Sequence, residues 1–198
     1  MSAFPAQRRT DPFLFNGAKC AVPVPAGHAL VRAALVQASL DPTVRAIGVV
    51  SAVKVEGHGV ALNAIVLDGD RGRQVLDIIE ARLIRDVDGE GLFLLAIDAL
   101  GLPLLTLTAA DVLREPWLSN ATAVWSCRFV RVPVSDRITI LQSLAEGPLT
   151  IAEAASAARL SRDPVGSVLS LACADVIEID ITDAPLGPET SVRRRRAP

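Results

Sequence analysis

A tight turn between two strand-like segments constrains the fold of this chain most strongly. The sequence from His58 to Ile84 reads HGVALNAIVLDGDRGRQVLDIIEARLI, and DGDRGR near its centre is rich in residues that favour turns. Residues 60–67 and 74–81 on either side are rich in Val, Ile and Leu. This pattern predicts a β-hairpin, and the β-branched residues of 44–59 predict an extended segment before it.

Helix-like segments surround this hairpin. Apolar residues recur with helical spacing at residues 28–40 and 90–100, and Gly101 is a natural cap for the second of these helices. A short apolar strand at 102–108 follows, and then a helix. Because helices alternate with strands, we expect an α/β domain at residues 21–134, with a mixed sheet and flanking helices.

The pattern changes after residue 134. Residues 136–148 fit one helix, whose expected apolar face consists of Ile138, Leu141 and Leu144. Two further helices and an alternating strand, IEIDIT, follow. The order of helix, helix, turn, helix and strand is typical of a winged helix, which we expect at residues 135–192.

Capping residues support the two later helices. Thr150 and Glu153 have the spacing of a capping box, in which each side chain bonds the backbone of the other residue. Asp163 followed by Pro164 fits a cap and the first position of the next helix. Outside the two domains we expect a flexible segment at residues 1–20 and a basic tail at residues 193–198.

Composition limits the classes of function. Hydrophobic residues make up 51% of the 198 residues, which is enough for a sizeable core. No apolar run reaches the roughly 18 residues of a membrane span, so we expect a cytoplasmic, nucleoid-associated protein without membrane contact. Three widely spaced cysteines without a CxxC motif predict neither a disulfide framework nor a zinc site.

Several segments together resemble the TnsA family, the endonuclease subunits of heteromeric transposases. These segments are LVQASLDPTVRAI, LGLPLLTLTAADVLREPWLSNATAVWSCR and DRITILQSLAEGPLTIAEAA, and the resemblance covers about residues 25–192. The family joins a restriction-endonuclease-like domain to a C-terminal winged helix, so the resemblance implies this architecture. It also implies a nuclease site that needs a carboxylate from the first helix, an Asp on one strand and an acid-x-Lys on the next.

The chain departs from that site at three of four positions. ALNAIVL places Leu62 and Asn63 at the family's Pro-Asp, and LDIIEAR keeps Asp77 but places Ile79 at the lysine. The first helix, GHALVRAALVQASL, contains no acidic residue. Carboxylates are the ligands that Mg²⁺ prefers, and a neutral amide is a poor substitute. We therefore expect no catalytic residues, no metal and no cofactor.

A second alignment, shifted by three residues, keeps an enzymatic alternative open. It places Glu80-Ala81-Arg82 at the acid-x-Lys and uses Asp68 or Asp70 as the other acid. Under this reading the protein is a divergent Mg²⁺-dependent DNA endonuclease. Arginine stays protonated and is a weak replacement for the lysine, and acids in a turn usually form turn hydrogen bonds.

The expected winged helix suggests contacts to double-stranded DNA. Its last helix would present exposed residues to the major groove, and the helix would pack on the core through its apolar residues. The residues expected at the DNA are Arg159, Arg162, Ser167, Ser170, Arg193, Arg194, Arg195 and Arg196. The exposed positions expected on this helix are Arg162, Asp163, Gly166, Ser167 and Ser170. The residues expected in the core are Val165, Val168, Leu169 and Leu171.

The excess of acidic residues in the expected winged helix argues against a protein that recognises DNA on its own. Between Asp136 and Asp183, three arginines stand against eight acidic residues, before the arginines of the tail. Non-specific affinity for DNA comes mainly from cationic contacts to phosphate. The leading hypothesis is a non-catalytic DNA-associated protein, acting as a regulator or as an accessory subunit of a larger nucleoprotein complex. A protein-binding module, including a homodimer, remains a further alternative.

Overall fold

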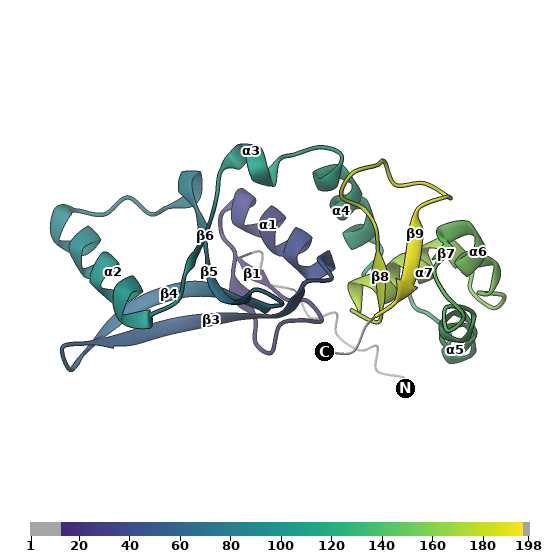
Figure 1. Ribbon diagram of the computed structural model, residues 1–198, viewed down its shortest axis with the longest axis horizontal. Helices are drawn as coiled ribbons and strands as arrows, with labels where there is room; N and C mark the ends of the chain where they lie inside the picture. The colour runs from purple at the N-terminus through teal and green to yellow at the C-terminus, as the bar shows by residue number, and fades with distance from the viewer. Residues whose placement is uncertain (1–12, 196–198) are drawn as a thin grey trace, which may run out of the picture.

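The turn at Asp70 and Arg71 organises the larger of two lobes in the computed structural model, which describes residues 13–195 (Figure 1). Strands β4 (His58–Gly69) and β5 (Gly72–Ile78) form the predicted antiparallel hairpin. Strand β3 (Val44–Val55) pairs antiparallel with β4, and β6 (Leu104–Leu107) pairs parallel with β5. The sheet order β3-β4-β5-β6 confirms a mixed sheet in an α/β fold.

Two helices flank this sheet, as predicted. Helix α1 (Ala29–Leu40) buries Leu35 against the strand residues Ile47 and Leu67. Helix α2 (Val87–Leu100) buries Ala96 in a separate cluster that includes Leu62, Ala64, Val66 and Val75. Side chains alternate along a strand, so α1 and α2 use residues of opposite parity on β4. Gly101 ends α2 in the left-handed conformation, as its position predicted.

Several element boundaries differ from the sequence prediction, and two of the differences have a clear local cause. Helix α2 begins at Val87 rather than residue 90, because Asp86 caps it by accepting the N–H of Gly89. The second hairpin strand ends at Ile78 rather than residue 81, because Ile79–Ala81 turn into one turn of 3-10 helix. The chain then reaches α3 (Ala109–Val112) through β6, and Thr108 forms a capping box with Asp111.

Helix α4 (Trp117–Ser126) connects the lobes and was not predicted. It begins after Pro116 without a side-chain cap, so the sequence carries no start signal. It packs against α1 of the larger lobe and against the smaller lobe. The Trp125 ring stacks on the Phe15 ring with centroids 5.2 Å apart, so this tryptophan packs α4 against the N-terminal segment.

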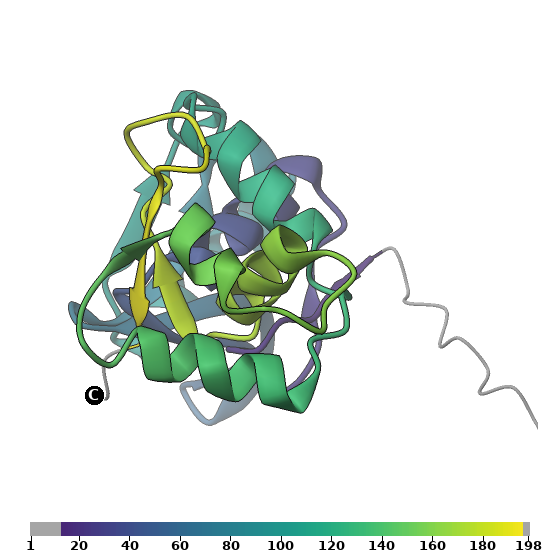
Figure 2. The same ribbon diagram turned by 90° about the vertical axis from the view of Figure 1, so that its right-hand side faces the viewer.

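The smaller lobe combines three helices with a three-stranded antiparallel sheet (Figure 2). The caps predicted at Thr150 with Glu153 and at Asp163 are all present. Ile177, Ile179 and Ile181 are buried, although the strand predicted over residues 177–182 ends at Ile179. The sheet order is β7-β9-β8. In chain order the elements are α5 (Val134–Ser143), β7 (Leu149–Thr150), α6 (Ile151–Ser156), α7 (Pro164–Cys173), β8 (Ile177–Ile179) and β9 (Ser191–Arg194).

The predicted apolar face of α5 was wrong at one position. Ile138 is 51% exposed, whereas Ile140 is fully buried and Leu144 is nearly so. The helix turns this way because Asp136 faces inward and accepts the N–H of Leu160 at 3.2 and 3.1 Å from its two carboxylate oxygens. A buried carboxylate therefore sets the rotation of α5.

The expected flexible segment and the expected basic tail both contribute strands. Within the expected flexible segment 1–20, β1 (Leu14–Phe15) pairs with β2 (Val24–Pro25), and Phe15 is buried. Arg193 and Arg194 of the expected tail belong to β9 instead. Residues 1–12 and 196–198, including Arg196, lie outside the described part of the chain. No helix within residues 13–195 is long and apolar enough to cross a membrane.

Candidate functional site

Two positions that correspond to the nuclease site, Asn63 and Asp77, line one pocket of about 280 Å³. The pocket lies where β4 and β5 meet α2 and the segment before it. Its polar lining consists of Asn63, Asp77, Arg82, Arg85 and Glu90, and apolar side chains such as Leu62, Phe93 and Leu104 form its walls. The sequence therefore brings Asn63 and Asp77 together as the alignment predicted.

The guanidinium of Arg82 is hydrogen-bonded to both carboxylate oxygens of Asp77. Arg82 donates from Nε to Oδ1 at 2.9 Å and from Nη2 to Oδ2 at 2.6 Å, and the Thr106 hydroxyl donates to Oδ2 at 3.3 Å. The hydrogen bonds from Arg82 hold the pKa of Asp77 below its ordinary value. Asp77 is thus ionised, but both of its oxygens are already paired with a cation of the chain itself.

The local fold explains why Arg82 reaches Asp77. Asp77 stands near the end of β5, and the one-turn 3-10 helix Ile79–Ala81 reverses the chain immediately afterwards. Arg82 follows this turn and its side chain lies over the strand end. Thr106 is the register partner of Asp77 on the parallel strand β6, which brings its hydroxyl to the same carboxylate.

The other two positions do not supply nuclease chemistry. Asn63 lies at an irregularity in the pairing of β3 with β4, is exposed, and has a left-handed backbone (φ +52°) that asparagine tolerates. Ile79, at the lysine position, is 43% exposed and does not line the pocket. The pocket thus contains an amide and a paired carboxylate, with no lysine.

The acids of the alternative alignment are separated. Asp68 and Asp70 line a different pocket, of about 290 Å³, beside α1, and Asp70 pairs with Arg45 at 3.1 Å. Glu80 accepts the N–H of Ala109 at 2.8 Å and so caps α3. Within residues 13–195 no three His, Cys, Asp or Glu side chains are grouped so that they could hold a metal ion.

The predicted exposed face of α7 was wrong. Gly166, Ser167 and Ser170 are buried, while Val165, predicted to lie in the core, is 46% exposed. The Ser170 hydroxyl donates to the Val130 carbonyl at 2.9 Å, in the segment between α4 and α5. Val168, Leu169 and Leu171 are buried as predicted. Helix α7 is enclosed on this side because Val130, in the segment after α4, contacts Ser170, Ser161 contacts Ser167, and Val124 of α4 contacts Cys173.

One of the arginines expected at DNA joins the lobes instead, and another is paired within the smaller lobe. Arg195 donates to the carbonyls of Pro42 and Val44 at 2.6 and 3.0 Å, and it pairs with Asp175 at 3.2 Å. Arg193 donates to the buried carboxylate of Glu178 at 2.5 Å. Arg194, on β9, is exposed. Arg159 and Arg162, in the segment before α7, are exposed as well.

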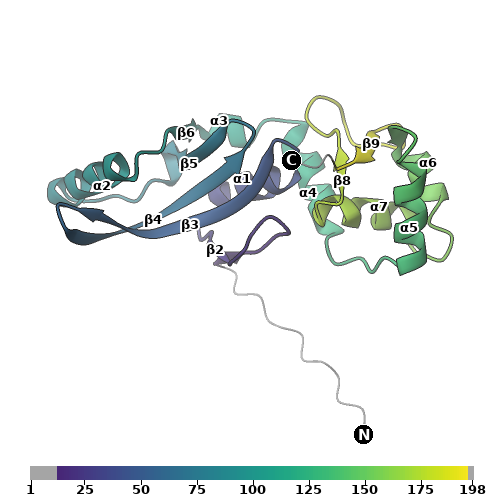
Figure 3. The ribbon, with the colours of Figure 1, turned by 60° about the horizontal axis from the view of Figure 1, so that its bottom comes forward.

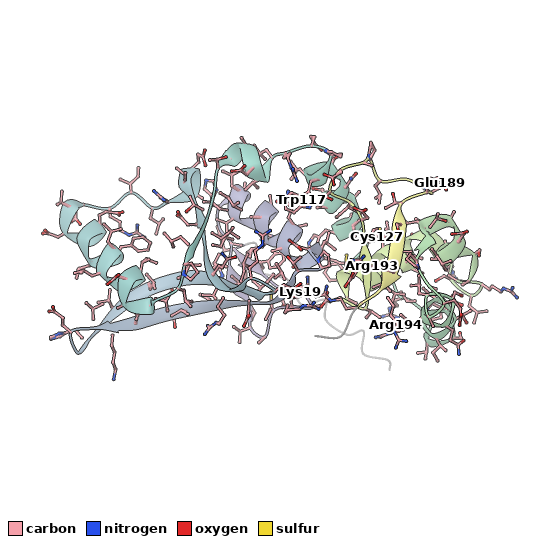
Figure 4. All side chains as sticks on the ribbon, in the orientation of Figure 1. Lys19, Trp117, Cys127, Glu189, Arg193 and Arg194 are labelled. Atoms are coloured by element: carbon pink, nitrogen blue, oxygen red, sulfur yellow. The ribbon has the colours of Figure 1, made fainter. Side chains whose placement is uncertain are left out.

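Lys19 completes this connection from the larger lobe (Figure 4). Its ammonium donates to the Asp41 carbonyl at 2.6 Å and to the Ala38 carbonyl at 3.3 Å, at the C-terminal end of α1, and lies 3.6 Å from Asp175. Burial lowers the pKa of Lys19 to about 8. We call Lys19, Asp175, Glu178 and Arg195 the interlobe clamp.

The sequence alone did not indicate the interlobe clamp. Lys19 and Arg195 are 176 positions apart, and each stands in a segment that was expected to be flexible. The one available signal was composition, because Lys19 is one of two lysines among 20 basic residues and lies between apolar segments. A comparison with protein-family models found none that matches the chain, and a comparison with curated proteins found no match.

Proposed function

We propose that the protein is a non-catalytic, DNA-associated accessory subunit of a larger nucleoprotein complex, built on a TnsA-like architecture. The observation that carries this proposal is the pairing of Asp77 with Arg82. The one retained acid of the nuclease pattern is neutralised within the chain, and Ile79 stands where the water-activating lysine would be required. A divalent ion at Asp77 would have to displace a bidentate guanidinium without help from a second acid.

The topology of the smaller lobe supports the winged-helix part of the proposal. A helix, a short strand, two helices and two strands, with the middle place in the sheet taken by β9, follow the order that this module has. A winged helix often reads DNA with the second helix of its helix-turn-helix, which corresponds to α7. Here α7 offers only its first turn, so base reading by Ser167 and Ser170 is not part of the proposal.

DNA contact is therefore assigned to the phosphate backbone. Arg159, Arg162 and Arg194 are exposed, and no ion pair engages them within residues 13–195. Contacts of this kind give affinity without sequence preference. Such a protein would depend on its partners in the complex for target choice, which suits an accessory subunit placed at the nucleoid.

One set of titrations tests both halves of the proposal. The full chain is mixed with a fluorescent 20-bp duplex, and separately with supercoiled plasmid in Mg²⁺ or Mn²⁺. We expect salt-sensitive binding of the duplex and no nicking of the plasmid. Changing Arg159 and Arg162 together to Ala should reduce the slope of log affinity against log salt by about two.

The matched control changes Arg71 and Arg73, which are exposed on the larger lobe, to Ala and should leave the slope unchanged. Absence of binding at low salt would remove DNA from the proposal. Nicking by the wild-type protein that Asp77→Asn abolishes would show instead that the pocket is an active site.

A further inference from the structure

Helix α2 is apolar on both of its sides. Ala96, Phe93 and Ile97 face the sheet, whereas Val87, Leu94 and Leu95 are 88%, 59% and 55% exposed. A helix that is hydrophobic all round is normally buried on all sides. The solvent side of α2 therefore has the composition of a surface that another protein covers.

The exposed residues of α2 continue into neighbouring segments. Leu83, Leu94 and Leu104 line the mouth of the same pocket, and Ile84, just before α2, is fully exposed. We call Leu83, Ile84, Val87, Leu94, Leu95 and Leu104 the α2 surface. Their exposed area is on the order of 800 Å², which exceeds the largest patch of a typical monomer and equals what one partner contributes to a standard interface.

Acidic side chains surround the α2 surface. Asp88 and Asp98 lie on the exposed side of α2 and have no ion-pair partner within residues 13–195, and Asp86 caps the helix. Glu90 pairs with Arg85, and Asp77 with Arg82, so these four groups cancel. The helix contains no lysine or arginine. The rim of the α2 surface is thus negative, which favours an apolar partner with a basic rim.

The smaller lobe presents such a partner surface. Val134 and Ile138 lie one turn apart on the exposed side of α5, and the N–H of Leu160 bonds to Asp136 on the inward side of the first turn of the same helix. We call these residues, with Phe129 in the preceding linker, the α5 surface. All four are more than half exposed.

The rim of the α5 surface is positive. Arg131 and Arg137 lie on or next to α5, and Arg159 and Arg162 flank Leu160 in sequence. All four arginines are exposed, and none has an ion-pair partner in the described part of the chain. The two surfaces therefore match in character, since both are apolar, and differ in the sign of the surrounding charge.

We propose that the α2 surface of one copy binds the α5 surface of another, so that the protein associates head to tail. The two surfaces lie at opposite ends of the elongated molecule, where they cannot meet within one chain (Figures 1 and 3). A twofold α2–α2 contact is disfavoured, because an antiparallel pair would bring Asp88 of one copy near Asp98 of the other. An α5–α5 contact would likewise oppose arginines.

Head-to-tail contacts leave one surface free at each end, so association continues into rings or open chains. The α5 surface exposes only about 500 Å² of apolar area, which is below the contribution of one partner to a standard interface. We therefore expect weak association that charge supports and salt reduces. This inference does not rest on the proposed function: the surfaces share Leu83, Leu94 and Leu104 with the pocket and Arg159 and Arg162 with the proposed DNA contact, but neither DNA nor Asp77 takes part in the association.

Mixing two variants tests the proposal. Sedimentation velocity of the wild-type chain between 1 and 200 μM, without DNA, should show an average mass that rises beyond a dimer at low salt and falls in 0.5 M salt. Leu94→Glu and Ile138→Glu should each stay monomeric at 20.9 kDa. Mixed in equal amounts, the two variants should form a dimer and nothing larger. Leu94→Glu keeps the α5 surface and Ile138→Glu keeps the α2 surface, so one contact forms and no further copy can add.

The control Val22→Glu changes an aliphatic residue of similar exposure away from both surfaces and should associate like the wild type. A wild-type protein that is monomeric over the whole concentration range overturns the proposal. So does a dimer that Leu94→Glu abolishes and Ile138→Glu leaves intact, which would indicate a twofold α2 contact. Duplex binding can fail or succeed independently of either result, so the two proposals are separable.

Discussion

At the scale of single residues, charges that resemble functional groups are satisfied by other parts of the chain. Asp77 is bound by Arg82, Glu80 caps a helix, and Lys19 is bound by helix carbonyls and Asp175. Each contact is made by a residue whose type alone suggested catalysis or nucleic-acid binding. Geometry, rather than residue type, separates these roles.

Lys19 predicts a pH dependence of stability. Its pKa is about 8 in the folded protein against 10.5 ordinarily, so between these values the unfolded chain binds more protons and the free energy of unfolding rises with pH. The difference in this free energy between wild type and Lys19→Met should therefore increase by roughly 3 kcal/mol from pH 8 to 10.5. Urea unfolding at pH 7.5, 9 and 10.5 measures it.

Comparing two variants isolates Lys19 from other groups that titrate in the same range. Lys54, the other lysine, is exposed on β3, so Lys54→Met is the matched control for removing a lysine side chain outside the interlobe clamp. A difference for Lys19→Met that does not vary with pH would mean that burial does not lower the pKa of Lys19.

At the scale of elements, β9 holds the smaller lobe to the larger one. Arg195 follows β9 and donates to the carbonyls of Pro42 and Val44, whereas Arg194 on the strand is exposed. Removing one partner of a buried ion pair costs about 3–5 kcal/mol, and part of that cost should appear as local opening of the lobes. Arg195→Ala should therefore speed amide exchange in α7 and at the end of α1.

Hydrogen exchange followed by mass spectrometry measures this opening. Arg194→Ala is the matched control, since it removes the same group from the neighbouring position and should leave exchange in α7 unchanged. Equal exchange in the two variants would show that the carbonyl contacts of Arg195 do not hold the lobes together.

The same elements mark how far the sequence predicted the structure. The hairpin around Asp70, the capping box of Thr150 and the cap at Asp163 depend on residues within a few positions of one another, and all were predicted. The exposure of Ser167 and Ser170 was wrong because their partners, Ser161 and the Val130 carbonyl, lie in connecting segments whose path the sequence does not indicate. Asp77 was placed in its pocket by pattern, but its bond to Arg82 depends on a 3-10 turn that the sequence did not indicate.

At the scale of the whole molecule, the two lobes share a core. Leu40 of α1 and the α4 residues Ala121 and Val124 belong to the same buried cluster as the residues of α5, α6 and α7. The lobes therefore differ in architecture but do not have independent interiors. A boundary near residue 134, which the sequence suggested between two domains, falls beside this common core.

We accordingly expect one cooperative unfolding transition. Tryptophan fluorescence reports on α4, where Trp117 and Trp125 stand at or near the ends, and far-ultraviolet circular dichroism reports on all helices. Urea curves from the two probes should coincide, as they do for two-state proteins. Two resolved transitions, or a probe-dependent midpoint, would mean that the shared cluster does not couple the lobes.

Because α7 is enclosed, substitutions in this helix should act on the stability of the protein rather than on what it binds. Beyond its first turn, every neighbour of α7 is fixed by the chain's own packing, so a new side chain there is judged by volume and hydrogen-bond fit. Ser167 and Ser170 should then tolerate alanine or cysteine but not a larger residue, whatever molecule the protein meets. Residues that determine binding specificity should therefore lie elsewhere on the surface of the protein.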